Sequence, residues 1–139
     1  MTKRNCLNCK KSIIGKNKRN NKYCNSFCFA EHRYKQYIKR RLGNKETGLS
    51  GDYQISRYIK RWLREIRGTK CERCGWNAVH PTTKKVPVEV NHKDGNYRNC
   101  RPKNLELICP NCHSLTLNFR GLNRGNGREQ RRIKGEPRI

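Results

Sequence analysis

The chain has 139 residues, enough for one domain of usual size or for two very small ones. Its 34 Lys and Arg residues against 10 Asp and Glu give a formal net charge of +24, and Val, Ile, Leu and Phe make up only 18% of the sequence. Apolar burial alone cannot repay the entropy of folding such a chain. A second source of folding energy is therefore needed, and the nine cysteines could supply it as metal ligands.

The composition also bears on where the protein works. The sequence has no run of about 18 apolar residues, which a transmembrane helix would require. Its first 30 residues contain no apolar stretch of signal-peptide length, so we expect a soluble protein of the cytoplasm. Cysteines in that compartment bind metals more often than they form disulfides.

The positive charge is concentrated at the two ends of the chain. Residues 1–41 carry 13 basic residues and one acidic residue, and residues 114–139 carry seven basic and two acidic residues. Each Lys or Arg that neutralises a phosphate releases counterions, so such ends favour nucleic acid. A charge excess that only keeps the protein soluble is the alternative. We expect nucleic acid, and no membrane, as the partner.

Eight of the nine cysteines form four close pairs, three spaced C-x-x-C and one C-x-x-x-C. Two such turns can supply the four thiolates of a closed zinc site. Pairing by proximity predicts two structural zinc sites, one formed by Cys6, Cys9, Cys24 and Cys28 and the other by Cys71, Cys74, Cys109 and Cys112. Disulfides or a redox C-x-x-C pair are the alternatives. The ninth cysteine, Cys100, is expected to be a thiol in a loop without a metal.

The first half of the chain predicts a zinc knuckle over residues 6–24, followed by a helix. Ser26 is a suitable N-cap for that helix, and Gly43 ends it. The apolar positions at near-helical spacing are Phe27, Ala30, Tyr34, Tyr37, Ile38 and Leu42. Residues 43–52 have three glycines and no periodicity, which is typical of a linker.

A second helix is predicted from its apolar stripe, which begins after Asp52 as N-cap and ends before Gly68. The stripe consists of Ile55, Tyr58, Ile59, Trp62, Leu63 and Ile66. Basic side chains lie mainly off this stripe, and phosphate contact and simple solvation explain them about equally well. The candidate nucleic-acid contacts are Arg57, Arg61 and Arg64 on this helix and Arg120, Arg124 and Arg128 near the C-terminus.

The second half predicts a strand, a loop, a strand and a helix. Residues 86–91 alternate like a short strand, residues 93–96 are a turn signal, and residues 105–108 read as a second strand. Pro110 can open a helix that runs to about Phe119, and a glycine- and arginine-rich tail follows. The predicted fold is a small zinc-stabilised α+β protein. Its parts are a zinc-binding basic module over 1–43, a linker over 44–52, a domain over 53–120 and a flexible basic tail over 121–139.

Two histidines and an asparagine suggest a site in that second half. His92 ends the first strand, Asn104 precedes the second, and His113 lies at the start of the helix. A hairpin folded against a helix would bring the three into one cleft. Phosphodiester hydrolysis needs a base that activates water and a divalent ion that stabilises negative charge. One histidine could be the base, and the other could be a ligand of the ion. Alternatively, His113 is a further zinc ligand or a helix cap.

At these residues the sequence resembles the HNH endonucleases, and most closely the small phage and intron homing type. The words that carry the resemblance are N-H-x-D-G-N, N-L-x-L-x-C-P-x-C-H-S and F-R-G-x-N, within residues 68–125. The resemblance implies a ββα-metal nuclease core with a structural zinc, acting on DNA in a bacterial host cell. It also implies that His92 is the general base and that Asn104 fixes the loop orienting it. His113 and Asn91 would then bind a catalytic divalent ion, commonly Mg²⁺.

One position departs from that family. Many relatives have Asp or His where this chain has Asn91, and a neutral amide oxygen is a weaker ligand than a carboxylate. Asp94 could compensate, although Asp-Gly is first of all a turn-forming pair. The runner-up interpretation is a non-catalytic zinc-binding regulator that binds DNA or RNA with the same scaffold.

Overall fold

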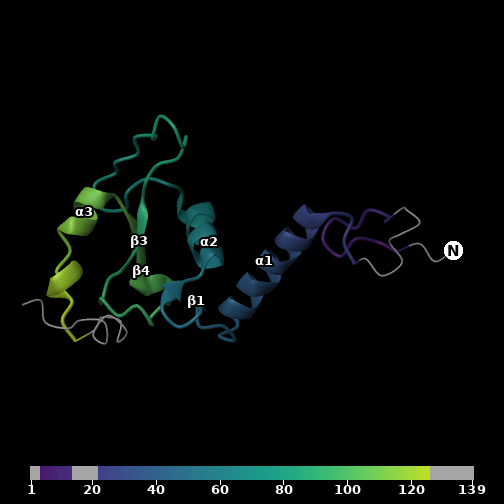
Figure 1. Cartoon of the computed structure of the whole chain (residues 1–139), viewed down its shortest axis with the longest axis horizontal. Helices are drawn as coiled ribbons and strands as arrows, with labels where there is room; N and C mark the ends of the chain where they lie inside the picture. Colours follow the sequence, from purple (N-terminus) through teal and green to yellow (C-terminus); the bar gives the residue numbers. More distant parts are fainter. Residues whose placement is uncertain (1–3, 14–21, 126–139) are drawn as a thin grey trace, which may run out of the picture. The chain divides into compact units, whose positions relative to one another are not determined.

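The structure is a computed structural model that describes residues 4–13 and 22–125, in two compact units, residues 1–46 and 47–139 (Figure 1). Each unit contains one of the two four-cysteine groups. The boundary between the units falls inside the segment 44–52 that the sequence predicted as a linker. Among the described residues, no helix combines the length and the apolar character that crossing a bilayer requires.

The first unit consists of a cysteine turn and one long helix, α1 (Ser26–Leu42). The N-cap is Asn25, not Ser26 as predicted: Asn25 is extended, and its side chain accepts a hydrogen bond from the backbone N–H of Cys28 at 2.8 Å. Ser26 instead begins the first turn. The helix ends at Gly43, as predicted, where the backbone N–H of Gly43 donates to Lys39 at 3.1 Å.

The buried face of α1 differs from the predicted stripe. Cys28, Tyr34 and Tyr37 are buried, whereas Phe27 is 68% exposed and Leu42 is 60% exposed. The helix must turn Cys28 towards the other three cysteines, and this requirement sets which face is covered. The apolar spacing therefore predicted the wrong buried positions at the two ends of α1, where Phe27 and Leu42 are exposed.

The second unit opens with a small antiparallel hairpin, β1 (Leu49–Ser50) and β2 (Gln54–Ile55). Part of the predicted linker therefore pairs as strand, and Asp52 lies in the hairpin turn and does not cap a helix. Helix α2 (Arg57–Arg67) starts one turn later than predicted, with the Ser56 side chain accepting from the N–H of Tyr58 at 3.2 Å. It ends before Gly68, as predicted, where φ is +79°.

The core of this unit is a second hairpin, β3 (Glu89–His92) and β4 (Leu105–Ile108), which pair antiparallel with Glu89 opposite Ile108 and His92 opposite Leu105. Figure 1 shows this hairpin between α2 and the short helix α3 (Pro110–Ser114). The fully buried apolar side chains of the unit come from α2 and β4: Ile59, Leu63, Leu105, Leu107 and Ile108.

Two element boundaries in this half differ from the predictions. Strand β3 begins at Glu89 and not at residue 86, because the N–H of Val88 bonds to the carbonyl of Val86 at 2.9 Å in a tight turn around Pro87. Helix α3 ends at Ser114 and not near Phe119. The chain leaves the helical path after Ser114, and the side chain of Asn118 donates a hydrogen bond to the backbone carbonyl of His92 at 3.1 Å.

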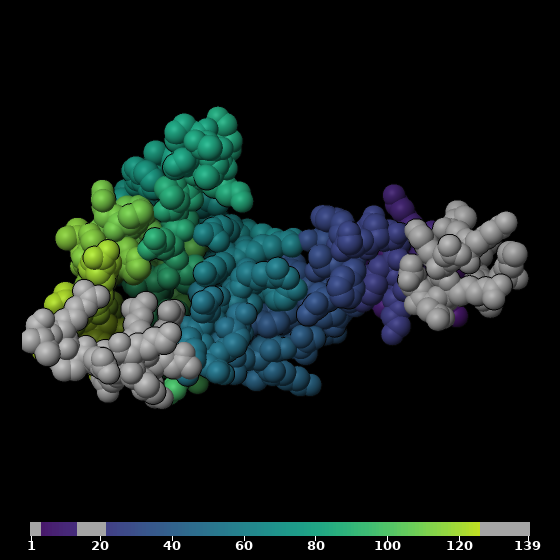
Figure 2. Space-filling view, in the orientation of Figure 1, coloured from purple at the N-terminus to yellow at the C-terminus, as the bar shows by residue number. Residues whose placement is uncertain are grey.

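The predicted irregular tail begins with a short 3₁₀ helix, η2 (Arg120–Leu122). Its neighbour Asn123 donates to the carbonyl of Gly95 at 2.8 Å, so this part of the chain is held against the β3 turn. Residues 126–139, including Arg128, lie outside the described residues. By contrast, residues 72–85 are exposed throughout and include the projection at the top of Figure 2.

Glu72 and Arg67 form hydrogen bonds with the backbone groups on the edge of β4 that faces away from β3. Glu72 pairs with Leu107 twice: its backbone N–H donates to the carbonyl at 2.8 Å, and its carboxylate accepts the N–H at 2.9 Å. Arg67 donates to the carbonyls of Leu105 and Pro102, each at 2.7 Å, and pairs with Glu72 at 3.4 Å. The edge of a two-stranded sheet is thereby closed without a third strand.

Candidate functional site

The structure groups the cysteines as the spacing predicted. In each set of four, the sulfur atoms all lie within 4.8 Å of one another, so each set could hold a metal ion. The sulfur atoms of Cys9 and Cys24 are 3.7 Å apart, and those of Cys74 and Cys109 are 3.8 Å apart. Four thiolates bound tetrahedrally at about 2.3 Å from a zinc ion lie about 3.8 Å apart. The donor sets therefore fit zinc.

Backbone N–H groups support the thiolate form in the first cysteine group. Burial acts to raise the pKa of Cys6, but backbone hydrogen bonds, those from Cys9 and Cys24 first, outweigh it and lower the pKa to about 6. A side-chain hydrogen bond with Cys28 and burial raise the pKa of Cys24 to about 12. The cluster therefore holds at least one ready thiolate, which is the form that binds metal.

The second group has the same electrostatic pattern. Burial again opposes it, but backbone hydrogen bonds from Cys109 and Cys74 lower the pKa of Cys71 to about 6. The hydrogen bond with Cys74 raises the pKa of Cys112 to about 12. Cys109 is also the N-cap of α3, where its sulfur accepts from the N–H of Cys112 at 3.4 Å. The second cysteine group and the first turn of α3 therefore share Cys109 and Cys112.

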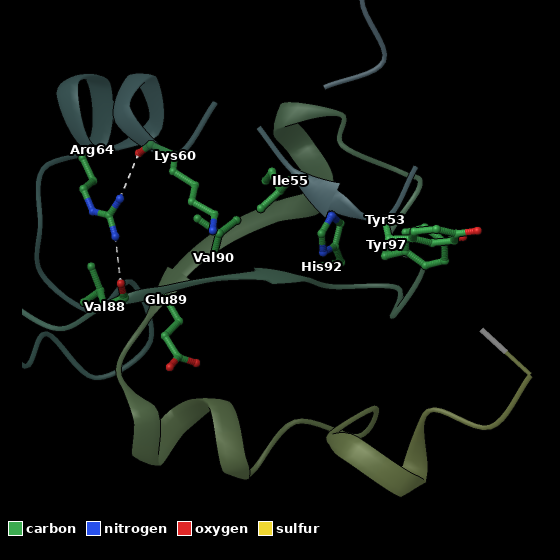
Figure 3. A pocket seen from close by; sticks show the side chains of 9 residues that line it. All are labelled: Tyr53, Ile55, Lys60, Arg64, Val88, Glu89, Val90, His92 and Tyr97. Atoms are coloured by element: carbon green, nitrogen blue, oxygen red, sulfur yellow. Dashed lines mark hydrogen bonds between the residues drawn. The ribbon is translucent and has the colours of Figure 1, made fainter. Parts of the chain in front are cut away.

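His92 is the last residue of β3 and lies beside the ninth cysteine. Its Nε2 is 3.6 Å from the sulfur of Cys100, which is 2% exposed. The sequence predicted Cys100 as a loop thiol and gave no signal for this neighbour, because the contact depends on how residues 93–104 fold back. His92 also lines a cleft of about 380 Å³, together with Tyr53, Ile55, Lys60, Arg64, Val88, Glu89, Val90 and Tyr97 (Figure 3).

His113 faces a different set of residues. Its Nδ1 lies 2.5 Å from a carboxylate oxygen of Glu89, and its ring meets Phe119 edge to face at 5.5 Å between centroids. Asn91 is 6% exposed, and its amide donates to Glu106 at 2.7 Å. Glu89 and Asn91 alternate with Val90 and His92 along the strand, so the two pairs point to opposite faces.

Glu89 is therefore in contact with His113 on the α3 side, Asn91 shares that face of β3, and His92 lies on the opposite face. Figure 3 shows that Val90 and His92 point from β3 to the side on which Lys60, Arg64 and Ile55 lie, while Glu89 points the other way. This arrangement differs from the prediction that His92 and His113 lie in one cleft, because the two histidines contact different sets of residues. Strand alternation, applied to residues 89–92, would have separated the two faces.

Asn104 holds the loop that follows His92. Its amide donates to the carboxylate of Asp94 at 2.9 Å and to the carbonyl of Asn99 at 2.8 Å, and its oxygen accepts from the N–H of Asp94 at 3.2 Å. Burial acts to raise the pKa of Asp94, but hydrogen bonds from Asn99 and Asn104 lower it below its usual range. Asp94 is thus occupied in the turn, as its Asp-Gly context indicated.

An ion pair next to Asn91, between an exposed arginine and a buried glutamate, was not predicted. Glu106 is 6% exposed and bonds to the guanidinium of Arg73 at 2.5 and 3.2 Å. Burial opposes the ionised form, yet the hydrogen bonds from Arg73 and Asn91 keep the pKa of Glu106 low. Position 106 lies directly opposite Asn91 in the hairpin, so the strand register carries the signal once the register is known.

The predicted nucleic-acid contacts have differing local roles. Arg64 donates to the carbonyl of Val88 at 3.0 Å, which ties α2 to the segment before β3. Arg61 pairs with Glu65 at 2.7 Å on the exposed surface. Arg57 and Arg120 lie over the rings of the residues next to them, Tyr58 and Phe119, at 5.2 and 5.0 Å. Arg124 is exposed.

Comparison with known proteins identifies one relative. Over 65 residues the chain is 46% identical to the H-N-H endonuclease F-TflIV of Escherichia phage T5. The match covers 47% of this chain and 28% of that protein, so the chain spans less than a third of its relative. No family model and no solved structure matches the chain. The similarity confirms the predicted resemblance to HNH endonucleases of phage type.

Proposed function

We propose that this protein is a metal-dependent DNA endonuclease of the HNH homing type that hydrolyses phosphodiester bonds. The observation that carries the proposal is the 46% identity to a phage H-N-H endonuclease. The order β3, β4, α3 supports it, since it is the strand–strand–helix order of a ββα-metal core. The formal charge of +24 supports DNA as the partner. We place the protein in the cytoplasm of a bacterial host.

Zinc is the metal we propose for both cysteine groups, in a purely structural role. Each group offers four thiolates and leaves no position for water or substrate, which is the pattern of a structural zinc site. One group would stabilise an N-terminal basic module (1–43) and the other the nuclease domain (53–120). The basic module and the tail (121–139) would place that domain on its DNA.

His113 and Asn91 would hold the catalytic cation, Mg²⁺ or another divalent ion. When bound, the ion supplies positive charge to the phosphate and to the leaving oxygen. His113 offers its ring nitrogen Nδ1, which lies beside a carboxylate oxygen of Glu89. Asn91 offers its amide oxygen, because its amide nitrogen donates to Glu106.

His92 would act as the general base and take a proton from the attacking water. Its place next to Asn91 supports this role, because the two residues are adjacent along the chain at the end of β3. Lys60, which lines the same cleft, would attract a phosphate to it. Asn104 would act as a positioning residue through the loop it binds at Asp94 and Asn99.

Cleavage by the His92→Ala variant tests the proposal. The zinc-loaded full-length protein is incubated with plasmid and phage DNA and Mg²⁺, and cut ends are mapped. We expect a loss of at least about a hundredfold in cleavage rate, with zinc content and DNA affinity retained, because the base acts on water and affinity comes from phosphate contacts. His80→Ala is the matched control, since His80 lies in the exposed projection.

Near-normal cleavage by His92→Ala would mean that the base is a different residue. Failure of the wild-type protein to cleave any DNA while binding it tightly would instead favour the non-catalytic regulator. The two outcomes are separated by running the binding and the cleavage assays on the same preparation.

A further inference from the structure

We infer that Glu89 is a ligand of the catalytic cation, in a site formed with His113 and Asn91. The inference rests on the proposed function, and it assigns to this chain a carboxylate that the HNH motif words do not contain. Position 89 lies three residues before His92 and outside the N-H-x-D-G-N word.

The geometry brings the donor atoms together. A carboxylate oxygen of Glu89 lies 2.5 Å from Nδ1 of His113, so two cation-binding groups from different elements converge. Glu89 and Asn91 are two residues apart on β3 and share a face of the strand. The Glu89 side chain is 55% exposed, which leaves room for a hydrated ion and for a phosphate. Figure 3 shows the carboxylate pointing towards α3.

The chemistry of the cation requires such a carboxylate. Mg²⁺ prefers oxygen ligands and is commonly bound through one or two carboxylates together with substrate phosphates. Asn91 is neutral, and imidazole is a softer ligand than Mg²⁺ prefers. A site of Asn91 and His113 alone would therefore bind Mg²⁺ weakly.

The other nearby acidic groups have partners already. Glu106 is buried and bonds to Asn91 and to the partly exposed guanidinium of Arg73, which neutralises its charge. Asp94 accepts hydrogen bonds from Asn99 and Asn104 in the loop after β3. Glu89 is the carboxylate in hydrogen-bond contact with the proposed ligand His113.

Glu89 thereby accounts for the departure at position 91. Where relatives carry an acidic or imidazole ligand just before the first histidine, this chain carries an amide and has its carboxylate two residues earlier on the same face. The negative charge of the site is kept and its position along the strand is changed.

The test measures Mn²⁺ binding by electron paramagnetic resonance on the full-length, zinc-loaded protein without DNA. Glu89→Gln keeps a hydrogen-bond acceptor for His113 and removes the charge. We expect it to weaken Mn²⁺ binding at least about tenfold. Glu65→Gln is the matched control, since it removes an exposed carboxylate on α2.

Two further outcomes separate the inference from the proposed function. If His113→Ala loses Mn²⁺ and Glu89→Gln binds it as the wild type does, Glu89 only accepts a hydrogen bond and the inference is overturned. If the wild-type protein itself binds no Mn²⁺, the proposed cation site is absent and both fail. Zinc content and circular dichroism confirm that each variant is folded.

Discussion

The hydrogen bonds at the edge of β4 allow a direct test of how much Arg67 of α2 stabilises the fold. Arg67→Met keeps an unbranched apolar stem and removes every donor of the guanidinium. The carbonyl of Leu105, in a fully buried strand residue, then loses its charged donor at 2.7 Å. The carbonyl of Pro102 also loses Arg67, but it keeps the N–H of Leu105.

The expected cost follows from these contacts. A hydrogen bond from a charged group contributes about 1.5–3 kcal/mol, and the partly exposed pair with Glu72 adds less than about 1 kcal/mol. Because Pro102 retains a donor, the sum is about 2–4 kcal/mol. For a unit of this size each kcal/mol lowers the melting temperature by roughly 4–8 °C, so we expect a loss of roughly 8–32 °C.

Tryptophan fluorescence during heating measures this unit alone, because both tryptophans, Trp62 and Trp76, belong to it. Arg57→Met is the matched control: Arg57 is exposed and contacts the ring of Tyr58. We expect the control to melt within about 8 °C of the wild type, since its contact is worth about 0.5–1 kcal/mol at most. If Arg67→Met melts as the control does, the edge of β4 is not held by Arg67 and the reasoning fails.

The remaining predictions concern the metal groups and the turn after β3. Removing zinc with a strong chelator should abolish the helical circular dichroism signal, and added zinc but not Mg²⁺ should restore it; a metal-free protein that keeps its helices would contradict this. Gly95→Ala should lower the melting temperature by at least roughly 4–8 °C, because Gly95 has φ +73° and a Cβ there meets the side chains of Asn118 and Asn123. Gly121→Ala, with open space around it, should change the melting temperature little.

Features fixed by covalent spacing or by backbone geometry could be predicted from the sequence. The four cysteine pairs combine into the two groups that their order along the chain predicted. Gly43 and Gly68 end α1 and α2. Strand β4 has the predicted bounds, since its side chains are all buried and its limits are set by Asn104 and Cys109.

Features decided by competition between neighbours could not be predicted. Asp52 and Ser56 are both good N-caps, and the hairpin of β1 and β2 uses the residues around Asp52, which leaves Ser56 to cap α2. Asn25 and Ser26 compete in the same way at α1. Local capping preferences differ by a few tenths of a kcal/mol, so tertiary pairing decides between adjacent candidates.

The arginines show why charge patterns alone leave the roles of individual side chains open. Arg57, Arg64 and Arg67 are spaced along one helix, and the sequence offers the same two interpretations, phosphate contact or solvation, for such residues. Arg64 and Arg67 instead donate to backbone carbonyls at 3.0 Å or less, in a chain whose apolar content is too low to close its own sheet edge with a strand. A guanidinium has five donors in a fixed fork, so one arginine can replace a strand partner at several carbonyls. Part of the basic excess therefore compensates for the small core, and the arginines that remain exposed, such as Arg57 and Arg124, are the ones whose removal should lower the salt dependence of DNA binding.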